Sequence, residues 1–146
     1  MLSIVQEEKI SLLSDTVLYP EAAAFLRRLI YEQHSSPLPT AQIMGLLNIA
    51  HTSNYGQLRD YVIHQRDRNW PDSRRSAKVF YTELEKLLTQ MQTKRLIEDF
   101  RLVTSGQNSQ QAKQEMDELM AALALEFIQH LVAENMLLAE AQRNRR

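Results

Sequence analysis

The sequence predicts an all-α fold, a compact helical bundle of about five to seven helices. Its 146 residues include only three glycines and four prolines, fewer turn residues than a strand-rich fold of this size needs. Residues that favour helices, such as Leu, Ala, Gln, Glu and Arg, are abundant, and apolar residues recur at helical spacing through most of the chain. The length suits one ordinary domain, so we expect a single helical domain over residues 1–146.

Two helices are expected before residue 35. The first is short and ends before Asp15. The second begins at Pro20, because a proline in the first turn loses no hydrogen bond, and it runs to about His34. Arg27 and Arg28 lie outside its apolar face, where solvated surface charge is the usual interpretation and nucleic-acid contact is the weaker alternative. The apolar residues that define these helices are Ile4, Val5, Ile10, Leu12 and Leu13 in the first, and Phe25, Leu26, Leu29 and Ile30 in the second.

A loop and an apolar helix should follow. The segment SSPLP, residues 35–39, predicts the loop, because each proline disfavours helix in the residue before it. Thr40 is then expected to be the N-cap of the next helix. Residues 43–50, IMGLLNIA, are apolar nearly all round, so this helix should be central and surrounded by others. Gly45 leaves two explanations open, the close approach of a neighbouring helix and plain packing.

The next helix should run from a cap at Asn54 to about Arg68 and stop at the segment WPDS. Pro71 moves the preceding residue out of helical geometry, and Asp72 or Ser73 can cap a new helix that begins at about Ser73.

The helix after WPDS separates its apolar side chains from its basic ones. At about 100° per residue, Arg74, Arg75 and Lys78 lie opposite the apolar stripe. Farther along, Leu96, Ile97 and Phe100 fall out of phase with that stripe. This favours a break or kink near Thr93 over one long helix that packs on two sides. The stripe consists of Phe80, Leu84, Leu87, Leu88 and Met91.

A polar linker and one long helix complete the chain. The linker covers residues 104–111 and places Gly106 in the C′ position of the preceding helix. The last helix, about residues 109–141, has a wide apolar face. For the tail, residues 142–146, helix and disorder both stay open.

Composition and motifs exclude most chemistry. The chain has no cysteine, and its four histidines show no HxxxH or HExxH spacing. The motifs GxGxxG, GxxxxGK[ST] and GxSxG are also absent. We therefore expect no metal, no cofactor and no enzymatic activity. The start lacks a secretory-signal pattern, and no apolar run approaches the ~20 residues of a membrane span, so we expect a soluble, cytoplasmic protein.

The densest group of unusual residues surrounds Trp70. The net charge of the chain is −1, but the window from Arg59 to Lys78 holds six basic and three acidic residues. The macrodipole disfavours cations in the first turns of a helix by a few tenths to about 1 kcal/mol each, and a phosphate backbone would compensate. Pairing with Asp67 or Asp72 is the alternative. Trp70 itself either anchors the core or stacks on a base.

The chain resembles the small subunit of multi-subunit CRISPR effector complexes in three segments, LPTAQIMGLL from Leu38, QLRDYVIHQRDR from Gln57 and FYTELEKLL from Phe80. The resemblance implies a helical bundle, present in two or more copies, that contacts other protein subunits of the complex. It also implies a role in holding the guide RNA, the target strand or the displaced DNA strand, without cutting any of them.

Together, the resemblance and the charge pattern predict contacts to phosphates that do not read sequence and that weaken with salt. The expected contact residues are Arg66, Arg68, Arg74, Arg75 and Lys78, with Arg27 and Arg28 as weaker candidates. The competing hypothesis is a helical protein–protein adaptor or assembly factor without nucleic-acid contact. Its expected surface is the apolar face of the last helix and the solvent side of Leu96, Ile97 and Phe100.

Overall fold

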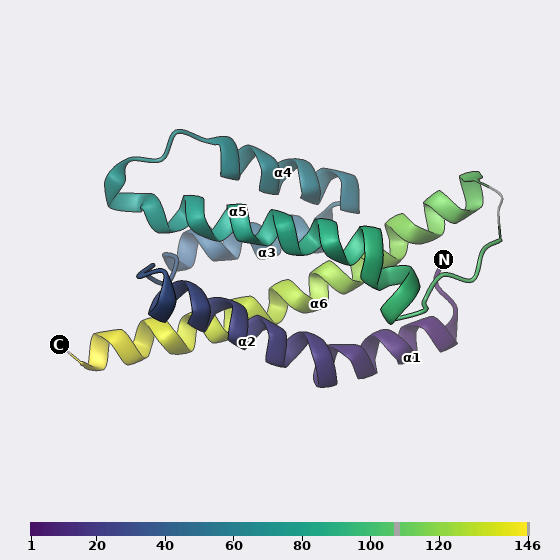
Figure 1. The fold of residues 1–146 in the computed structure, drawn as a ribbon, viewed down its shortest axis with the longest axis horizontal. Coiled ribbons are helices and arrows are strands. Elements are labelled where there is room, and N and C mark those ends of the chain that lie inside the picture. Colours follow the sequence, from purple (N-terminus) through teal and green to yellow (C-terminus); the bar gives the residue numbers. More distant parts are fainter. Residues whose placement is uncertain (107–108, 146) are drawn as a thin grey trace.

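The computed structural model describes residues 1–106 and 109–145. These residues form five helical rods and contain no strand, which confirms the all-α fold (Figure 1). The first rod joins α1 (Ile4–Leu13), η1 (Ser14–Leu18), α2 (Tyr19–Arg27) and η2 (Arg28–Glu32). The second and third are α3 (Thr40–Thr52) and α4 (Tyr55–Asp67). The fourth follows the short turn η3 (Asp72–Arg74) and joins α5 (Arg75–Gln90) to η4 (Met91–Asp99), and the fifth is α6 (Ser109–Asn144).

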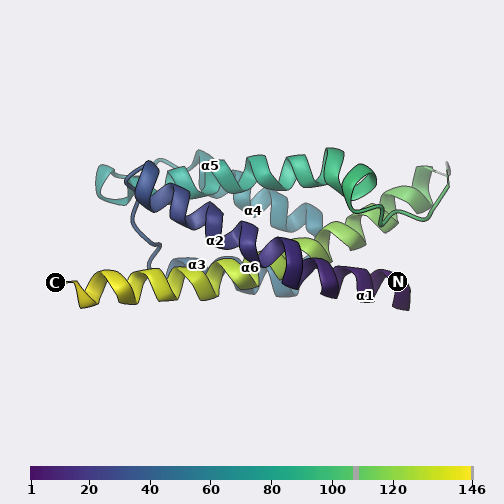
Figure 2. The same ribbon diagram turned by 60° about the horizontal axis from the view of Figure 1, so that its bottom comes forward.

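The long helix α6 organises the bundle. Helices α2, α3 and α4 all pack on it, and α4 lies along α5 in a hairpin. Figure 2 shows the C-terminal part of α6 and α1 along one edge of the molecule and α5 along the other, with the N-terminal part of α6 rising between these edges. The tail, for which helix and disorder were both open, continues α6 through Asn144, and residue 146 lies outside the described residues.

The core forms where the apolar faces of α2, α5 and α6 meet. The ring of Phe25 packs edge-on against Phe80 at 5.7 Å and against Phe127 at 6.0 Å between centroids. Such T-shaped pairs place the positive edge of one ring on the negative face of another. By length and composition α6 could cross a membrane, but 44% of its most apolar window is buried inside the bundle. Most of the apolar face of α6 belongs to the core, whereas Met136 and Leu137 are exposed. The fully buried side chains of this face include Leu123, Phe127 and Leu131.

The first rod does not break where the sequence predicted. Helix α1 ends at Leu13, before Asp15 as predicted, and Pro20 lies in the first turn of α2, but a π-helical turn, η1, joins the two helices without a break. The N–H of Tyr19 donates to the carbonyl of Ser14, five residues back. Pro20 has no N–H to donate, and in an α-helix its ring clashes with the carbonyl four residues earlier. The wider π-helical turn η1 lies just before Pro20.

The predicted break near Thr93 is also a π-helical segment. Through η4 the chain stays helical, but the hydrogen bonds span five residues. Met91 and Leu96 are five residues apart, and both are fully buried. The change of period thus returns Leu96 to the core, whereas Ile97 remains half exposed. This burial removes Leu96 from the surface expected for a protein–protein adaptor.

Helix α3 differs from its prediction in two ways, and the structure decides between the two explanations of Gly45. It lies at the surface, since Ile43 is buried but Met44 is 40% exposed. Thr40 is its first residue and not its N-cap, a position that Pro39 takes without a side-chain bond. A Cβ atom at Gly45 would lie 3.6 Å from the hydroxyl of Tyr61, which is an ordinary contact, so no neighbouring helix requires glycine there.

The cap of α4 is confirmed. The amide N–H of Gln57 donates to the side chain of Asn54 at 2.8 Å, and the side chain of Gln57 accepts from the amide of Asn54 at 3.0 Å. This reciprocal pair is a capping box, which satisfies two N–H groups that the helix cannot.

Candidate nucleic-acid interface

The candidate interface is the hairpin junction between α4 and α5. The predicted break at WPDS is confirmed, but the predicted caps are wrong, because Arg74 occupies the N-cap position of α5 and no side chain bonds there. Asp72 instead opens η3, whose last turn leads directly into α5. Backbone bonds close the turn, with the N–H of Arg74 donating to the carbonyl of Pro71 at 2.8 Å.

Two of the five main candidate cations are engaged within the junction. Lys78 donates its ammonium to the carbonyl of Arg66 at 2.9 Å, where a cation suits the negative end of α4. Arg66 forms two hydrogen bonds to Asp67, at 2.9 and 3.1 Å, and lies 3.5 Å from Glu85. The hydrogen bond from Arg66 lowers the pKa of the Asp67 carboxyl. The charge of Arg66 is thus largely compensated.

Trp70 is partly buried and fixed in orientation. Its indole N–H donates to the carbonyl of Gln65 at 2.6 Å, which closes the end of α4. The guanidinium of Arg68 lies 4.7 Å above its ring, a cation–π contact. Trp70 also packs against the edge of the core. One side of this residue therefore anchors the hairpin, while another lines a surface hollow described below.

Three arginines of the junction have no acidic partner within the described part of the chain. Arg68, Arg74 and Arg75 are all exposed, and none of them forms an ion pair there. The three positive charges therefore remain available to an external anion.

The loop of residues 33–39 meets this junction and forms hollows with it. The amide N–H of Ser36 donates to the hydroxyl of Ser76 at 2.8 Å, which ties the loop to α5. On one side of this contact lies the proline hollow, about 260 Å³, which Trp70 and Arg74 line. On the other lies the histidine hollow, about 640 Å³, lined by His34, Arg75 and Val79 among others. Ser36, Ser73 and Ser76 line both hollows.

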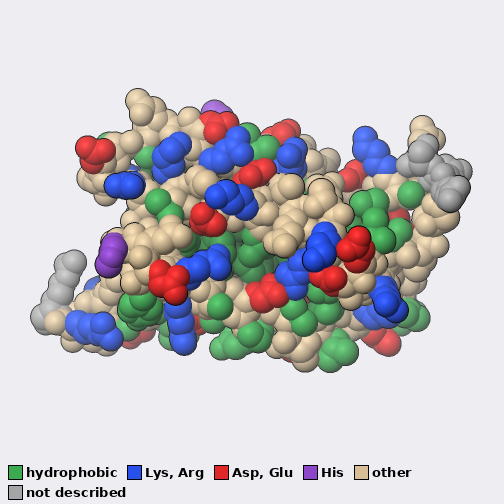
Figure 3. All heavy atoms as spheres, in the orientation of Figure 1, with side chains coloured by type: hydrophobic (Ala, Val, Ile, Leu, Met, Phe, Trp, Pro, Cys, Tyr) green, Lys and Arg blue, Asp and Glu red, His purple; other side chains and the backbone are tan. Residues whose placement is uncertain are grey.

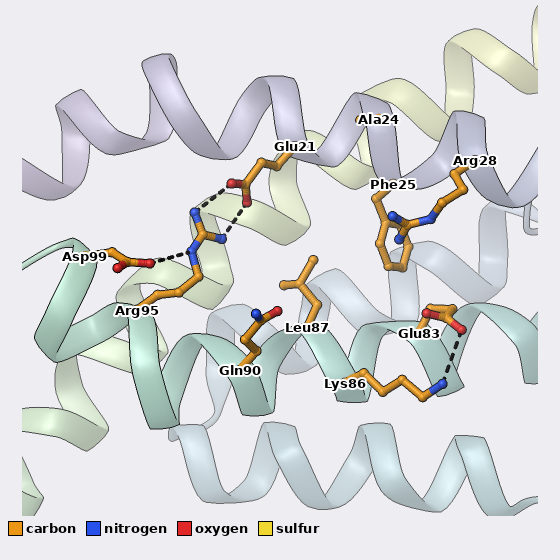
Figure 4. A pocket seen from close by; sticks show the side chains of 10 residues that line it. All are labelled: Glu21, Ala24, Phe25, Arg28, Glu83, Lys86, Leu87, Gln90, Arg95 and Asp99. Atoms are coloured by element: carbon orange, nitrogen blue, oxygen red, sulfur yellow. Dashed lines mark hydrogen bonds and ion pairs between the residues drawn. The ribbon is translucent and has the colours of Figure 1, made fainter.

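A cleft between α2 and α5 lies beyond the proline and histidine hollows. A small hollow at Arg75, Lys78 and Glu83 adjoins the histidine hollow, and Glu83 also lines the cleft of about 450 Å³. Figure 4 shows this cleft, with Arg28 projecting from the start of η2 and Lys86 from α5. Neighbouring hollows that share lining residues therefore extend from Trp70 along α5.

Acidic side chains moderate the charge of the cleft. Arg95 forms two hydrogen bonds to Glu21, at 2.6 and 2.7 Å, which join η4 to α2 (Figure 4). Lys86 lies 3.6 Å from Glu83. Figure 3 shows Lys and Arg side chains interspersed with Asp and Glu on this face of the molecule. Apart from Arg28, the candidate cations without an ion pair among the described residues thus lie at the junction and not in the cleft.

The two weaker candidates separate in the structure. Arg28 lines the cleft and forms no ion pair among the described residues. Its neighbour Arg27 is exposed, but its guanidinium lies 3.4 Å from Glu134, whose side chain is only 8% exposed. Arg27 thus compensates a buried carboxylate of α6, and little of its charge is left for a ligand.

Sequence reasoning missed Lys86 and the serines of the loop. Lys86 could have been found, because residues 75, 78, 82 and 86 follow each other at helical spacing on one face of α5. The serines carried no signal, since Ser36 and Ser76 are 40 residues apart and meet only through the tertiary structure.

The comparisons with known proteins identify no relative of the chain. No protein-family model matches the chain, and no curated protein or solved structure does. Within the described residues, no three His, Cys, Asp or Glu side chains are grouped so that they could hold a metal ion. The class of protein that these features outline is an all-α bundle with a local cationic junction.

Proposed function

We propose that the chain is a non-catalytic subunit of a CRISPR RNA-guided effector complex and that the α4–α5 junction holds a nucleic-acid strand by its phosphates. One observation carries the binding role, the exposure of Arg68, Arg74 and Arg75 around one junction without an acidic partner in the described residues. Guanidinium groups bind phosphate oxygens through two parallel hydrogen bonds, which supports this ligand. The resemblance of the three segments supports the class of complex.

The contacts would act without reading sequence. Phosphate contacts fix the position of a strand, whereas sequence is read by base edges. A strand that follows α5 would pass from Arg74 and Arg75 to Lys78 and then toward Arg28 in the cleft. One subunit offers few contacts, so several copies on one strand would raise the affinity through effective concentration. In this proposal the complex is cytoplasmic and its other subunits contact the rest of the bundle.

Replacement of the two arginines tests the binding role. The double variant Arg74→Ala with Arg75→Ala should weaken binding of a single-stranded oligonucleotide, because two phosphate contacts are lost. The slope of log affinity against log salt should fall in magnitude by about 1.4 for two contacts on a single strand. Fluorescence anisotropy across a salt series, with the isolated subunit and with the assembled complex, gives both quantities.

The matched control is Lys94→Ala with Lys113→Ala, which removes the same charge from two exposed residues outside the junction. It should change the affinity and the salt slope much less. Equal affinities of the wild-type and Arg74/Arg75 variant complexes at low salt would contradict the binding role. The effector assignment has its own test, because a tagged chain purified from its native cell should carry guide RNA and the other effector subunits.

Exposed apolar side chains on α1 favour a second candidate, a protein–protein adaptor. Ile4, Val5 and Leu12 are 61–73% exposed, which is unusual for three large apolar residues on one ten-residue helix. This surface differs from the one predicted, since Leu96 and most of the apolar face of α6 are buried. Size-exclusion mass with and without a single strand separates the candidates: an adaptor gains no mass from the nucleic acid.

A further inference from the structure

The proline hollow has one aromatic wall and one proline wall. Trp70 lines it from the α4–α5 junction, Pro37 and Pro39 line it from the loop, and the buried Ala77 of α5 lines it as well. The bond from the indole N–H to Gln65 fixes the orientation of the tryptophan ring, so this wall exists before any ligand arrives. The volume, about 260 Å³, is below the about 300–1,000 Å³ of sites for drug-sized ligands. The hollow therefore suits a single ring system and not a whole nucleotide.

Polar groups with unused bonding capacity also line this hollow. The side chain of Gln42 donates its Nε2 to the hydroxyl of Tyr81 at 2.9 Å, and its Oε1 accepts no bond from the described residues. The hydroxyl of Ser76 accepts from the amide of Ser36, which leaves its own hydrogen to donate. An acceptor and a donor thus line a hollow that also has an aromatic wall. An apolar side chain placed there would leave both groups unpaired, at a cost in free energy, whereas the edge of a base would pair with them.

Cations surround the hollow on the sides where a strand would pass. Arg74 lines it, and Arg68 lies over the ring of Trp70. The serines Ser36, Ser73 and Ser76 separate it from the histidine hollow, which Arg75 lines. A phosphate held at Arg75 would therefore adjoin the opening in which its base could lie.

We propose that the proline hollow binds one unpaired nucleobase of the strand whose phosphates Arg74 and Arg75 hold, an inference that rests on the proposed function. The base packs between Trp70 and the prolines, and its edge pairs with Gln42 and Ser76. Base–aromatic contact tolerates every base, so the slot adds affinity and register for single strands without strong sequence preference. Base-paired duplex would be excluded, because its bases are stacked inside the helix.

Trp70 is the only tryptophan in the chain, so intrinsic fluorescence reports on this wall alone. The subunit is titrated at about 50 mM salt with an oligothymidylate of about twelve nucleotides and with an abasic strand of the same number of phosphates. We expect the oligothymidylate to quench Trp70 and to bind about tenfold more tightly than the abasic strand, which should cause little quenching.

A variant that fills the proline hollow tests whether the difference in affinity between the two strands arises there. Ser73→Leu places a larger side chain at the wall of the hollow and, because Ser73 is exposed, should leave the fold intact. It should remove the roughly tenfold preference for oligothymidylate over the abasic strand, with both affinities measured on the same variant. Ser11→Leu makes the same substitution at an exposed position of α1 and should keep the preference. Circular dichroism of both variants verifies the fold.

The possible outcomes separate the two proposals. Equal affinity for the two strands, with no difference in quenching, overturns the base slot and leaves phosphate binding standing. Failure of both strands to bind overturns the slot together with the binding role. An emission shift caused by N-acetyl-leucinamide, without a response to either strand, also overturns the slot and instead identifies a pocket for an apolar protein side chain.

Discussion

At the scale of single residues, Glu115 shows how one carboxylate can organise a loop. It accepts hydrogen bonds from the amides of Thr104 and Ser105, at 2.8 and 2.9 Å, and from the side chain of Gln6 at 3.0 Å. Gln6 also bonds the carbonyl of Leu102 at 2.9 Å. Desolvation raises the pKa of Glu115, but the hydrogen bonds from Ser105, Thr104 and Gln6 outweigh it and lower the pKa to about 2. The start of α1, the loop after η4 and α6 are thereby joined.

The lowered pKa predicts acid sensitivity. The charged form is favoured in the folded state, so its contribution to stability is complete above the ordinary value of 4.5 and is lost as pH falls toward about 2. Glu115→Gln should cost roughly 1 kcal/mol near neutral pH, because solvent screens a carboxylate that is only partly buried. Urea unfolding of wild type and variant between about pH 6 and pH 3 should show this difference shrinking. A constant difference would show that Glu115 acts through packing alone.

The candidate cations show what helical phasing cannot predict for single residues. Sequence phasing placed Arg74, Arg75 and Lys78 away from the core, and all three are exposed. Helical phasing could not distinguish their roles. Lys78 donates to the carbonyl of Arg66, whereas Arg74 and Arg75 form no ion pair with an acidic residue in the described chain. Whether a cation is free or engaged depends on its partners and not on its helical angle.

At the scale of elements, both π-helical ends close in the same way. After η2, His34 has a φ of 57°, and the amide of Ser35 donates to the carbonyl of Leu29. After η4, Arg101 has a φ of 52°, and the amide of Leu102 donates to the carbonyl of Leu96. Gly106 was predicted to end this helix, but Arg101 takes the left-handed conformation that usually favours glycine. The wide last turn therefore ends on a residue that sequence rules would not select.

This conformation predicts a stabilising substitution. A side chain costs about 1–2 kcal/mol in the left-handed region, and glycine avoids that cost but loses more entropy on folding. Arg101→Gly should therefore raise the free energy of unfolding by about 0.5–1 kcal/mol, as measured by urea denaturation. The same replacement at the exposed Lys94, inside η4, should instead lower it by up to about 1 kcal/mol. Destabilisation of equal size at both positions would contradict this account of the helix end.

At the scale of the whole molecule, Asn135 attaches the loop of residues 36–39 to α6. Its side chain is almost fully buried, accepts from the amide of Leu38 at 2.9 Å and donates to the carbonyl of the same residue at 3.0 Å. An asparagine amide matches a backbone peptide group, so both polar groups of Leu38 are satisfied in the interior. This contact fixes the prolines that line the proposed base slot.

Loss of this contact should be costly. Asn135→Ala leaves a buried N–H and a buried carbonyl of Leu38 without partners, so the free energy of unfolding should fall by about 2–4 kcal/mol. The amide hydrogen of Leu38 should also exchange faster with solvent. Asn48→Ala, at an exposed position of α3, is the control and should be nearly neutral. Unchanged protection of the Leu38 amide in Asn135→Ala would contradict the attachment.

The sequence by itself determined the all-α class, the loop at residues 35–39, the cap at Asn54 and the break at WPDS. These features follow from local properties, because helical period, proline geometry and side-chain caps act within a few residues. Only the tertiary structure decided that Pro20 lies in a continuous rod, that Leu96 returns to the core and that Arg95 binds Glu21. The partners of Arg95 and Asn135 are 74 and 97 residues away, and no local pattern shows which distant segments the packing brings together.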